Sequence, residues 1–251
     1  MKKIVLLASM AVALLASCKK DNDAPKPDNA TKLLKKVTKV ENNVTTVYTL
    51  TYDAAKKLQS MISSDNVDKT FFTYDAAGNV TKVEESESDF KNIYTYTYAN
   101  GVPVSGTFKS WEINGGQPDD LIEDDILTYT VANNQVSKIH LNMTQSDLEL
   151  DFVMTYTNGN LTKVVSENSD FFAADFTFGT KKPAFPVISK WVLDHAGFSL
   201  QFASKNELLS AKYEFPGSQF DQTVTTTYTY DSAGYPLTSN DGETRLTFEY
   251  F

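Results

Sequence analysis

The chain has 251 residues, of which 41% are hydrophobic and 12% aromatic, and its formal net charge at pH 7 is −9. An acidic chain is repelled by polyanions, so nucleic acids and anionic lipid surfaces are poor partners for it. Cys18 is the only cysteine, which excludes an internal disulfide.

The amino-terminal residues have the pattern of an export signal. Lys2 and Lys3 precede an apolar run from Ile4 to Leu15, which is too short to span a bilayer as a helix. The run leads into Leu15-Ala16-Ser17-Cys18, which resembles the bacterial lipobox, whose cysteine is acylated and becomes the mature terminus. We predict a lipoprotein signal peptide at residues 1–17 and lipidation of Cys18, with an ordinary secretion signal and an accidental cysteine as the alternative.

The segment after the cysteine is polar and carries prolines. Residues 18–32 contain nothing to bury and predict a flexible tether. Loss of residues 1–17 removes two lysines and changes the formal charge from −9 to −11. The pattern Cys-Lys-Lys-Asp-Asn-Asp resembles the export signal of surface-displayed Bacteroidota lipoproteins. We therefore expect outer-membrane lipid as a partner through acylated Cys18, with the protein on the cell-surface or periplasmic face.

From residue 33 onward the chain repeats one strand–turn–strand pattern. The residues that close the first strand of each unit are Tyr52, Tyr74, Tyr98, Val131, Tyr156, Phe178, Phe202, Tyr230 and Tyr250. Side chains alternate within a unit: Tyr94, Tyr96 and Tyr98 share one face, and the other face is mostly threonine. The same alternation is expected for Phe198, Leu200 and Phe202. Such alternation predicts antiparallel strands with two chemically different faces.

The connections have the residues of tight turns. Asp75-Ala76-Ala77-Gly78-Asn79 and Asp231-Ser232-Ala233-Gly234 each place an aspartate where it can bond the turn backbone and a glycine where φ is positive. With the preceding tyrosines, these segments resemble the YD repeats of RHS-type secreted shells. Together with the lipobox, they are similar to an uncharacterised Bacteroidota outer-membrane lipoprotein family with a porin-like fold. That resemblance implies no activity and no catalytic residues.

Strand counting sets the predicted architecture. The units give roughly 16 to 18 strands of about 8 to 10 residues, and open twisted sheets rarely exceed about 10 strands without curling. We predict a single all-β domain over residues 33–251. It is a large antiparallel β-meander, curled or closed into a flattened barrel, with no substantial helix after the signal peptide.

The alternation allows two opposite orientations of the aromatic face. If that face points outward, the chain is a transmembrane barrel that conducts solutes, and the terminal strand ending in Phe251 resembles the carboxy-terminal signal of such barrels. Lysines early in the outgoing strands, at Lys82, Lys138 and Lys163, favour the inward orientation. A lysine facing lipid at mid-bilayer costs about 2 to 4 kcal/mol.

Chemistry-bearing residues are sparse. The two histidines are His140 and His195, and Asp194 beside His195 would point to the opposite face of a strand. No nucleophile, phosphate-loop or zinc motif occurs, so we predict no catalytic residue, metal or cofactor. The acidic segment from Asn114 to Asp125 is expected to be a solvated insertion rather than a calcium loop.

Prolines interrupt the pattern between Gly179 and Trp191. We expect a loop there that bends the sheet or covers one end of it. Phe185 and Trp191 are candidate ligand-binding residues, as an aromatic platform for a glycan, with burial in the core as the alternative. The predicted function is a noncatalytic, lipid-anchored module that binds a glycan or amphiphile or acts as a surface scaffold. The alternative is a porin-like solute channel.

Overall fold

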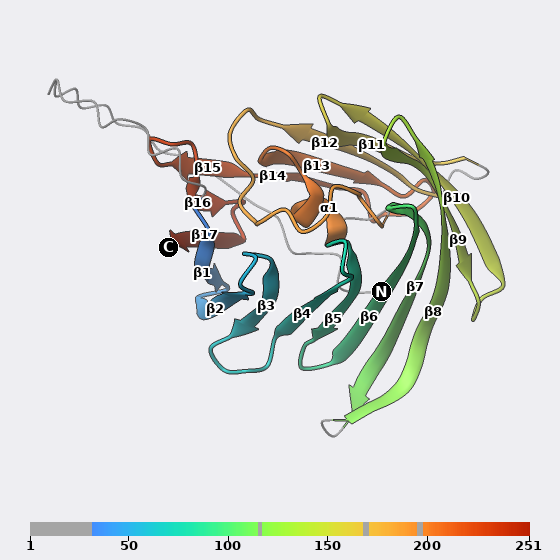
Figure 1. The fold of residues 1–251 in the computed structure, drawn as a ribbon, viewed down its shortest axis with the longest axis horizontal. Helices are drawn as coiled ribbons and strands as arrows, with labels where there is room; N and C mark the ends of the chain where they lie inside the picture. The colour runs from blue at the N-terminus through green and yellow to red at the C-terminus, as the bar shows by residue number, and fades with distance from the viewer. Residues whose placement is uncertain (1–31, 115–116, 168–170, 195–197) are drawn as a thin grey trace, which may run out of the picture.

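A computed structural model describes residues 32–114, 117–167, 171–194 and 198–251 (Figure 1). The predicted signal peptide, Cys18 and all but the last residue of the predicted tether lie outside the described residues, as does His195. The all-β prediction is confirmed, because the described residues form 17 antiparallel strands in one barrel-shaped, nearly closed sheet.

The strands are short and follow one another closely. They are β1 (Leu34–Glu41), β2 (Val44–Tyr52), β3 (Leu58–Ser63), β4 (Lys69–Tyr74), β5 (Val80–Ser86), β6 (Phe90–Ala99), β7 (Val102–Asn114), β8 (Gln117–Ala132), β9 (Gln135–Met143), β10 (Leu148–Thr157), β11 (Asn160–Ser166), β12 (Ala173–Phe178), β13 (Leu208–Glu214), β14 (Gln222–Thr225), β15 (Thr227–Tyr230), β16 (Pro236–Asn240) and β17 (Thr244–Tyr250). The only helix among the described residues is α1 (Phe198–Ala203). No helix of the described residues is long and apolar enough to cross a membrane.

Strands that are consecutive in sequence pair with each other, except β14 and β15, and β1 also pairs with β17. Only Thr226 separates β14 from β15; β14 pairs with β13, and β15 pairs with β16. The Thr226 amide donates to the Leu209 carbonyl at 2.8 Å, so the two form one bent strand. With β14 and β15 counted as one strand, the ring has an even number of antiparallel strands. The start of β1 and the end of β17 therefore lie at the same end of the barrel.

The aromatic face of the repeat lies inside the barrel. On β17, Leu246 and Phe248 are buried, whereas Arg245, Thr247 and Glu249 are exposed. The inward row continues across β4 to β8, where the register pairs in turn Phe72, Val83, Tyr94, Phe108 and Asp125. Burial of these side chains, at about 1.5 to 3 kcal/mol for each large apolar one, is the main force that curls the sheet.

The barrel has two unlike ends. We call one the tyrosine end: it contains Lys32, Phe251 and the connections that follow β2, β4, β6, β8, β10, β12 and β15. The carboxylate end contains the connections that follow β1, β3, β5, β7, β9, β11, β13 and β16. All the predicted strand-closing residues lie next to the tyrosine end of a strand, except Phe202, which belongs to α1.

One local prediction was wrong, and the structure refines another. Leu200 and Phe202 belong to α1 rather than to a strand, and both are buried because the helix enters the barrel. The segment from Gln117 to Asp125 is the first half of β8 and pairs with β7, so the expected insertion is an extended hairpin, in which Asp120, Leu121 and Ile122 are exposed. This pair of strands is the longest in the sheet and projects at the carboxylate end (Figure 1).

Candidate functional site

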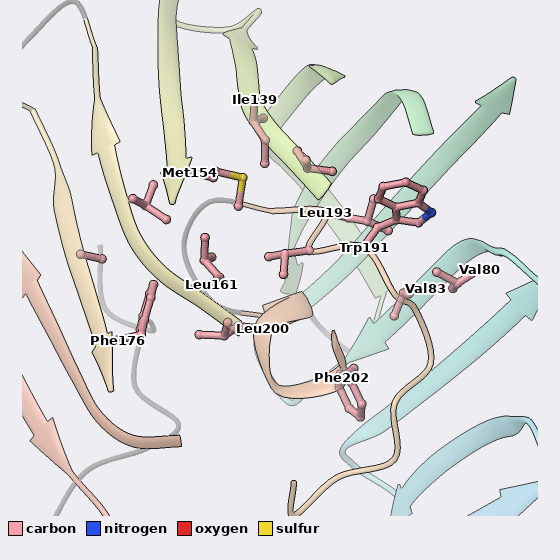
Figure 2. Packing of buried hydrophobic residues seen from close by; sticks show 14 of the residues in the cluster. Val80, Val83, Ile139, Met154, Leu161, Phe176, Trp191, Leu193, Leu200 and Phe202 are labelled. Carbon is pink, nitrogen blue, oxygen red and sulfur yellow. The ribbon is translucent and has the colours of Figure 1, made fainter. Parts of the chain in front are cut away.

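The connection between β12 and β13, residues 179–207, fills the barrel at the tyrosine end. We call it the plug; its residues 195–197 lie outside the described residues. Trp191, Leu193 and Phe202 are at most 2% exposed. Figure 2 shows them among barrel residues that include Val83, Ile139 and Met154. The plug therefore takes the place that a water-filled lumen would have.

Tyr129 of β8 holds the plug at its deepest described part. Its hydroxyl donates to the Leu193 carbonyl at 2.8 Å. A Cβ on Gly106 of β7 would lie 2.8 Å from that hydroxyl and 2.9 Å from the Thr95 carbonyl, so only glycine fits beneath it. The wall is shaped to accept this plug.

Glu207 closes the neck where the plug leaves the wall. Its buried carboxylate accepts from the Lys181 amide at 2.6 Å and from the Tyr230 hydroxyl at 3.1 Å. The Gly179 amide donates to the Glu207 carbonyl at 3.0 Å. These bonds pin both ends of the plug together, so it forms a closed loop fixed to the rim.

Asp194 has a structural role in the plug. Its carboxylate accepts the Ser199 amide, and the Ser199 hydroxyl accepts the Leu193 and Asp194 amides at 2.8 and 3.1 Å. This arrangement caps the start of α1.

The predicted aromatic pair lies in the plug. Trp191 is 2% exposed, and its Nε1 has no hydrogen-bond partner among the described residues. Phe185 is half-buried and packs edge-on against Phe202 and Phe248, at centroid distances of 5.7 and 6.1 Å. Neither ring offers an open face of the kind that stacks on a sugar at the surface, although Phe185 lines a cavity of about 30 Å³.

A series of tyrosine hydroxyls ties neighbouring strands together at the tyrosine end. Tyr52 donates to the Leu34 carbonyl at 2.6 Å, and Tyr74 to the Leu58 carbonyl at 2.8 Å. Further pairs of this kind are Tyr98 with Val80, Tyr228 with Leu208 and Tyr250 with Pro236. Burial raises the pKa of Tyr52 to about 12, which keeps the hydroxyl proton in place for this bond. The repeated tyrosine thus has a structural explanation.

Three turns at this end share one geometry. Asp53, Asp75 and Asp231 each accept, through Oδ1, the amide four residues later at 2.8 to 2.9 Å. The residue three positions after the aspartate has positive φ: Gly78 and Gly234 in two turns, but Lys56, at φ 63°, in the third. Every other described non-glycine residue with positive φ is Asn or Asp. A lysine occupies a position where the turn favours glycine.

A cleft of about 230 Å³ lies between two of these turns and the plug. Its lining includes Lys56, Lys57, Tyr74 and the plug segment Pro186-Val187-Ile188. The Lys57 Nζ lies 5.2 Å from the centroid of the Tyr74 ring. The cleft thus combines two cationic groups with aromatic and apolar surface.

The outer wall of the barrel carries ion pairs both between and within strands. Lys36 with Glu249, Lys109 with Asp124 and Lys163 with Asp175 join neighbouring strands, whereas Lys82 with Glu84 lies within β5 and Lys212 with Glu214 lies within β13. Lys138, one of the lysines singled out in the sequence, pairs with Asp151 at 3.0 Å and with Glu167 at 2.7 Å. The outer wall therefore carries charged side chains on many of its strands.

His140 also lies on this wall. Its Nδ1 is 3.0 Å from Asp151 Oδ1. Partial burial of Asp151 opposes ionisation, but hydrogen bonds from Lys138 and His140 hold the pKa of this carboxyl below its usual value. The pair sits on the convex outer wall, with its side chains 41% and 18% exposed, and it does not enter a cleft in the described residues.

Inward-facing acids line the barrel at the carboxylate end. The register places Glu85, Asn92, Ser110 and Glu123 side by side across β5 to β8. Burial raises the pKa of Glu85 to about 7, and the charge of Glu87 adds to the shift. Burial likewise raises the pKa of Asp125 to about 6. Glu85 and Glu123 are three strand spacings apart, about 14 Å along the sheet, which exceeds the separation of paired glycosidase acids.

Charge is segregated between the two ends. The connections of the tyrosine end hold seven lysines, Lys32, Lys56, Lys57, Lys181, Lys182, Lys190 and Lys205, against five acids, Asp53, Asp75, Asp194, Glu207 and Asp231. The described residues of the carboxylate-end connections hold nine acids, Asp65, Asp68, Glu87, Asp89, Asp147, Glu167, Asp221, Asp241 and Glu243, and no lysine or arginine. Within the described ranges, no three His, Cys, Asp or Glu side chains are placed to hold a metal ion.

Comparison with known proteins identifies the fold. No family model and no curated protein matches the chain. A porin-like protein from Bacteroides vulgatus aligns with a TM-score of 0.54 and 13% identity over 88% of this chain and 99% of its own. A porin-like protein from Bacteroides uniformis aligns with a TM-score of 0.48 and 15% identity over 86% of this chain and 96% of its own. The first alignment shows that this chain shares a near-closed β-barrel fold with a porin-like protein of Bacteroides.

Proposed function

We propose that this chain is a noncatalytic, lipid-anchored protein of the outer membrane, displayed on its cell-surface or periplasmic face. In this proposal, the outer wall of the barrel faces water rather than lipid. The ends of the barrel make the functional contacts, either as a scaffold or by binding a glycan or amphiphile. The plug is the observation that carries the proposal. Trp191, Leu193 and Phe202 are buried against the inner wall of the barrel, where a solute channel would run.

The outer wall supports the same conclusion. A lipid-facing barrel presents an apolar band about 25 Å tall. Here the outward positions carry lysine–carboxylate pairs across β5, β7 to β13 and β17. Burying several such pairs in hydrocarbon would cost far more than their mutual attraction returns.

The binding part of the proposal points to the tyrosine end. The 230 Å³ cleft is smaller than the roughly 300 to 1,000 Å³ of most small-molecule sites. It suits one sugar ring or one lipid headgroup rather than an oligosaccharide. Phe185, one of the residues singled out in the sequence, lines the smaller cavity on another side of the plug.

Membrane extraction tests the anchor. We expect wild-type protein to require detergent for release, because acyl chains add about 0.8 kcal/mol of membrane affinity per buried methylene. A Cys18→Ala variant should leave the membrane in a high-salt wash without detergent. Retention of that variant after the wash would contradict a barrel whose outer wall faces water, and it would support the solute-channel alternative. The same variant screened on glycan and lipid arrays would separate a binder from a scaffold.

A further inference from the structure

The lysines of the tyrosine end differ from those of the wall. Most lysines of the strands pair with acids on the same or an adjacent strand, whereas only Lys32 among the seven lysines at the tyrosine end outside the strands forms an ion pair among the described residues, with Asp231 at 2.9 Å. The other six make no ion pair with a carboxylate of the described residues. Among them, Lys56, Lys181, Lys182, Lys190 and Lys205 are exposed. Some of their ammonium groups have neutral partners: Lys182 lies 3.6 Å from the Tyr235 ring centroid, and Lys190 donates to Asn134 Oδ1 at 3.0 Å. This end therefore presents exposed cationic groups whose charge no carboxylate of the described residues neutralises by an ion pair.

The net charge of the chain does not determine what this end attracts. Most strands have 6 to 10 residues, which at about 3.3 Å each separate the two ends by roughly 25 Å. That distance is about three Debye lengths at physiological salt. A surface that approaches the tyrosine end therefore meets the field of its lysines, while the nine acids of the opposite end are screened.

Exposed apolar side chains lie among these lysines. Val187 of the plug is 52% exposed, and Phe251 is 70% exposed, with the Lys35 Nζ 5.7 Å from its ring centroid. Lysines mixed with exposed apolar and aromatic side chains are typical of surfaces that rest in the headgroup region of a bilayer. The cleft beside Val187 adds a concave place with two lysines, large enough for one headgroup.

Lys56 gives independent support for a binding role. It adopts φ 63° at the turn position that is glycine in the two matching turns. A non-glycine, non-Asn residue in this conformation costs about 1 kcal/mol or more. The turn would be more stable with glycine at this position. The lysine is therefore explained by a surface that needs a cation rather than by the stability of the turn.

The barrel begins at the same end. The Lys32 amide donates to the Tyr235 hydroxyl at 3.0 Å, so residues 18–31 must join the barrel at its tyrosine end. These 14 residues span at most about 50 Å when fully extended. An acylated Cys18 would thus keep the tyrosine end within about 50 Å of the membrane, where its lysines can reach the surface.

We infer that the tyrosine end docks on an anionic membrane surface, with Lys56, Lys181 and Lys182 against lipid phosphates and the carboxylate end directed away. The orientation rests on the lipid anchor proposed above. The affinity does not, because it comes from the lysines themselves. A lysine close to an anionic bilayer contributes about 1 kcal/mol, or roughly a fivefold change in partitioning.

Vesicle binding without the anchor tests the inference separately from the anchor. The protein for this test is residues 18–251 with Cys18→Ser, which contains the whole closed barrel. We expect it to sediment with vesicles containing phosphatidylglycerol in about 0.1 M NaCl, and not with pure phosphatidylcholine vesicles or in about 0.5 M NaCl. Absence of binding to the anionic vesicles in about 0.1 M NaCl would overturn the inference and leave the anchor proposal intact.

A pair of matched variants tests the position of the charge. Lys56→Glu with Lys182→Glu reverses two charges at the tyrosine end, and Lys69→Glu with Lys91→Glu reverses two at the carboxylate end, so both proteins have the same net charge. We expect the first pair to weaken partitioning more than about tenfold and the second less than about twofold. Equal losses would mean that net charge alone governs binding and would overturn the inference. Unfolding midpoints of both variants check that each is folded.

Discussion

The two ends of this barrel are built on the same strands and yet differ in charge and in how their strands are tied together, although both expose large apolar side chains. At the tyrosine end, aspartate turns, tyrosine hydroxyl bonds and a buried plug fix the strands, and exposed lysines face outward. At the carboxylate end, the connections are acidic, and the partly buried Glu85 and the buried Asp125 line the inner wall. The repeat thus supplies the wall, and the connections supply the differences between the two ends.

The largest expected contrast concerns packing. Phe202 is 1% exposed and contacts Phe72 with a centroid distance of 5.3 Å, so Phe202→Ala should lower the free energy of unfolding by about 3 to 5 kcal/mol. Phe108→Ala, at the half-buried stack with Tyr94 near the carboxylate end, is the matched control and should cost clearly less. Urea unfolding measures both. Similar losses would mean that the plug contributes no more to stability than the open end does.

Glu85 should make stability depend on pH. Because its pKa is raised to about 7 in the folded state, the folded protein binds the proton more tightly than the unfolded chain does. Stability is then lost as pH rises from the unfolded value of about 4.3 through 7, and Glu85→Gln should recover about 2 kcal/mol at about pH 8. Thermal unfolding at about pH 5.5 and pH 8 checks the sign. A wild-type protein that is more stable at the higher pH would contradict the buried acid.

Tyrosine hydroxyls should matter only where they bond a carbonyl. Tyr52→Phe and Tyr74→Phe each remove a bond to the neighbouring strand and should cost about 1 kcal/mol. Tyr156→Phe is the control, because its hydroxyl reaches only Met154 Sδ at 4.0 Å. Chemical denaturation of the three variants would refute this role if Tyr156→Phe were the most costly.

The smallest effect is a gain. Lys56→Gly should stabilise the turn after Asp53 by about 0.5 kcal/mol, since glycine adopts positive φ without strain. The same variant should bind anionic vesicles several-fold more weakly. A stability gain without a loss of binding would remove Lys56 from the proposed membrane surface.

The barrel could be predicted because its signal is repeated and strict. Alternation such as Tyr94, Tyr96 and Tyr98 with turn residues at regular intervals specifies antiparallel strands, and too many strands for an open sheet require curling. The helix was missed because apolar residues at 198, 200 and 202 fit a period of two, and six residues are too few to show a helical period. Asp194, which accepts the Ser199 amide, was the available sign of a helix start.

The candidate surfaces were harder to predict than the wall. The net charge of −9 argued against an anionic membrane, because an average over the chain hides the placement of Lys56, Lys181 and Lys182 at one end. Only the strand register shows which connections share an end. Likewise, prolines between Gly179 and Trp191 indicated an irregular segment, but only the packed structure reveals that it enters the barrel.

Fluorescence quenching on membranes tests the contrast between the ends most directly. Single fluorophores would be attached to the lipidated protein through Val187→Cys at the tyrosine end, Thr128→Cys on the exposed wall and Ser88→Cys at the carboxylate end. Acylation of Cys18 would leave each introduced thiol as the only reactive one. Our account predicts that a headgroup quencher acts most strongly at position 187 and least at position 88, and that an acyl-chain quencher does not reach position 128. Acyl-chain quenching at position 128, or stronger headgroup quenching at position 88 than at 187, would contradict it.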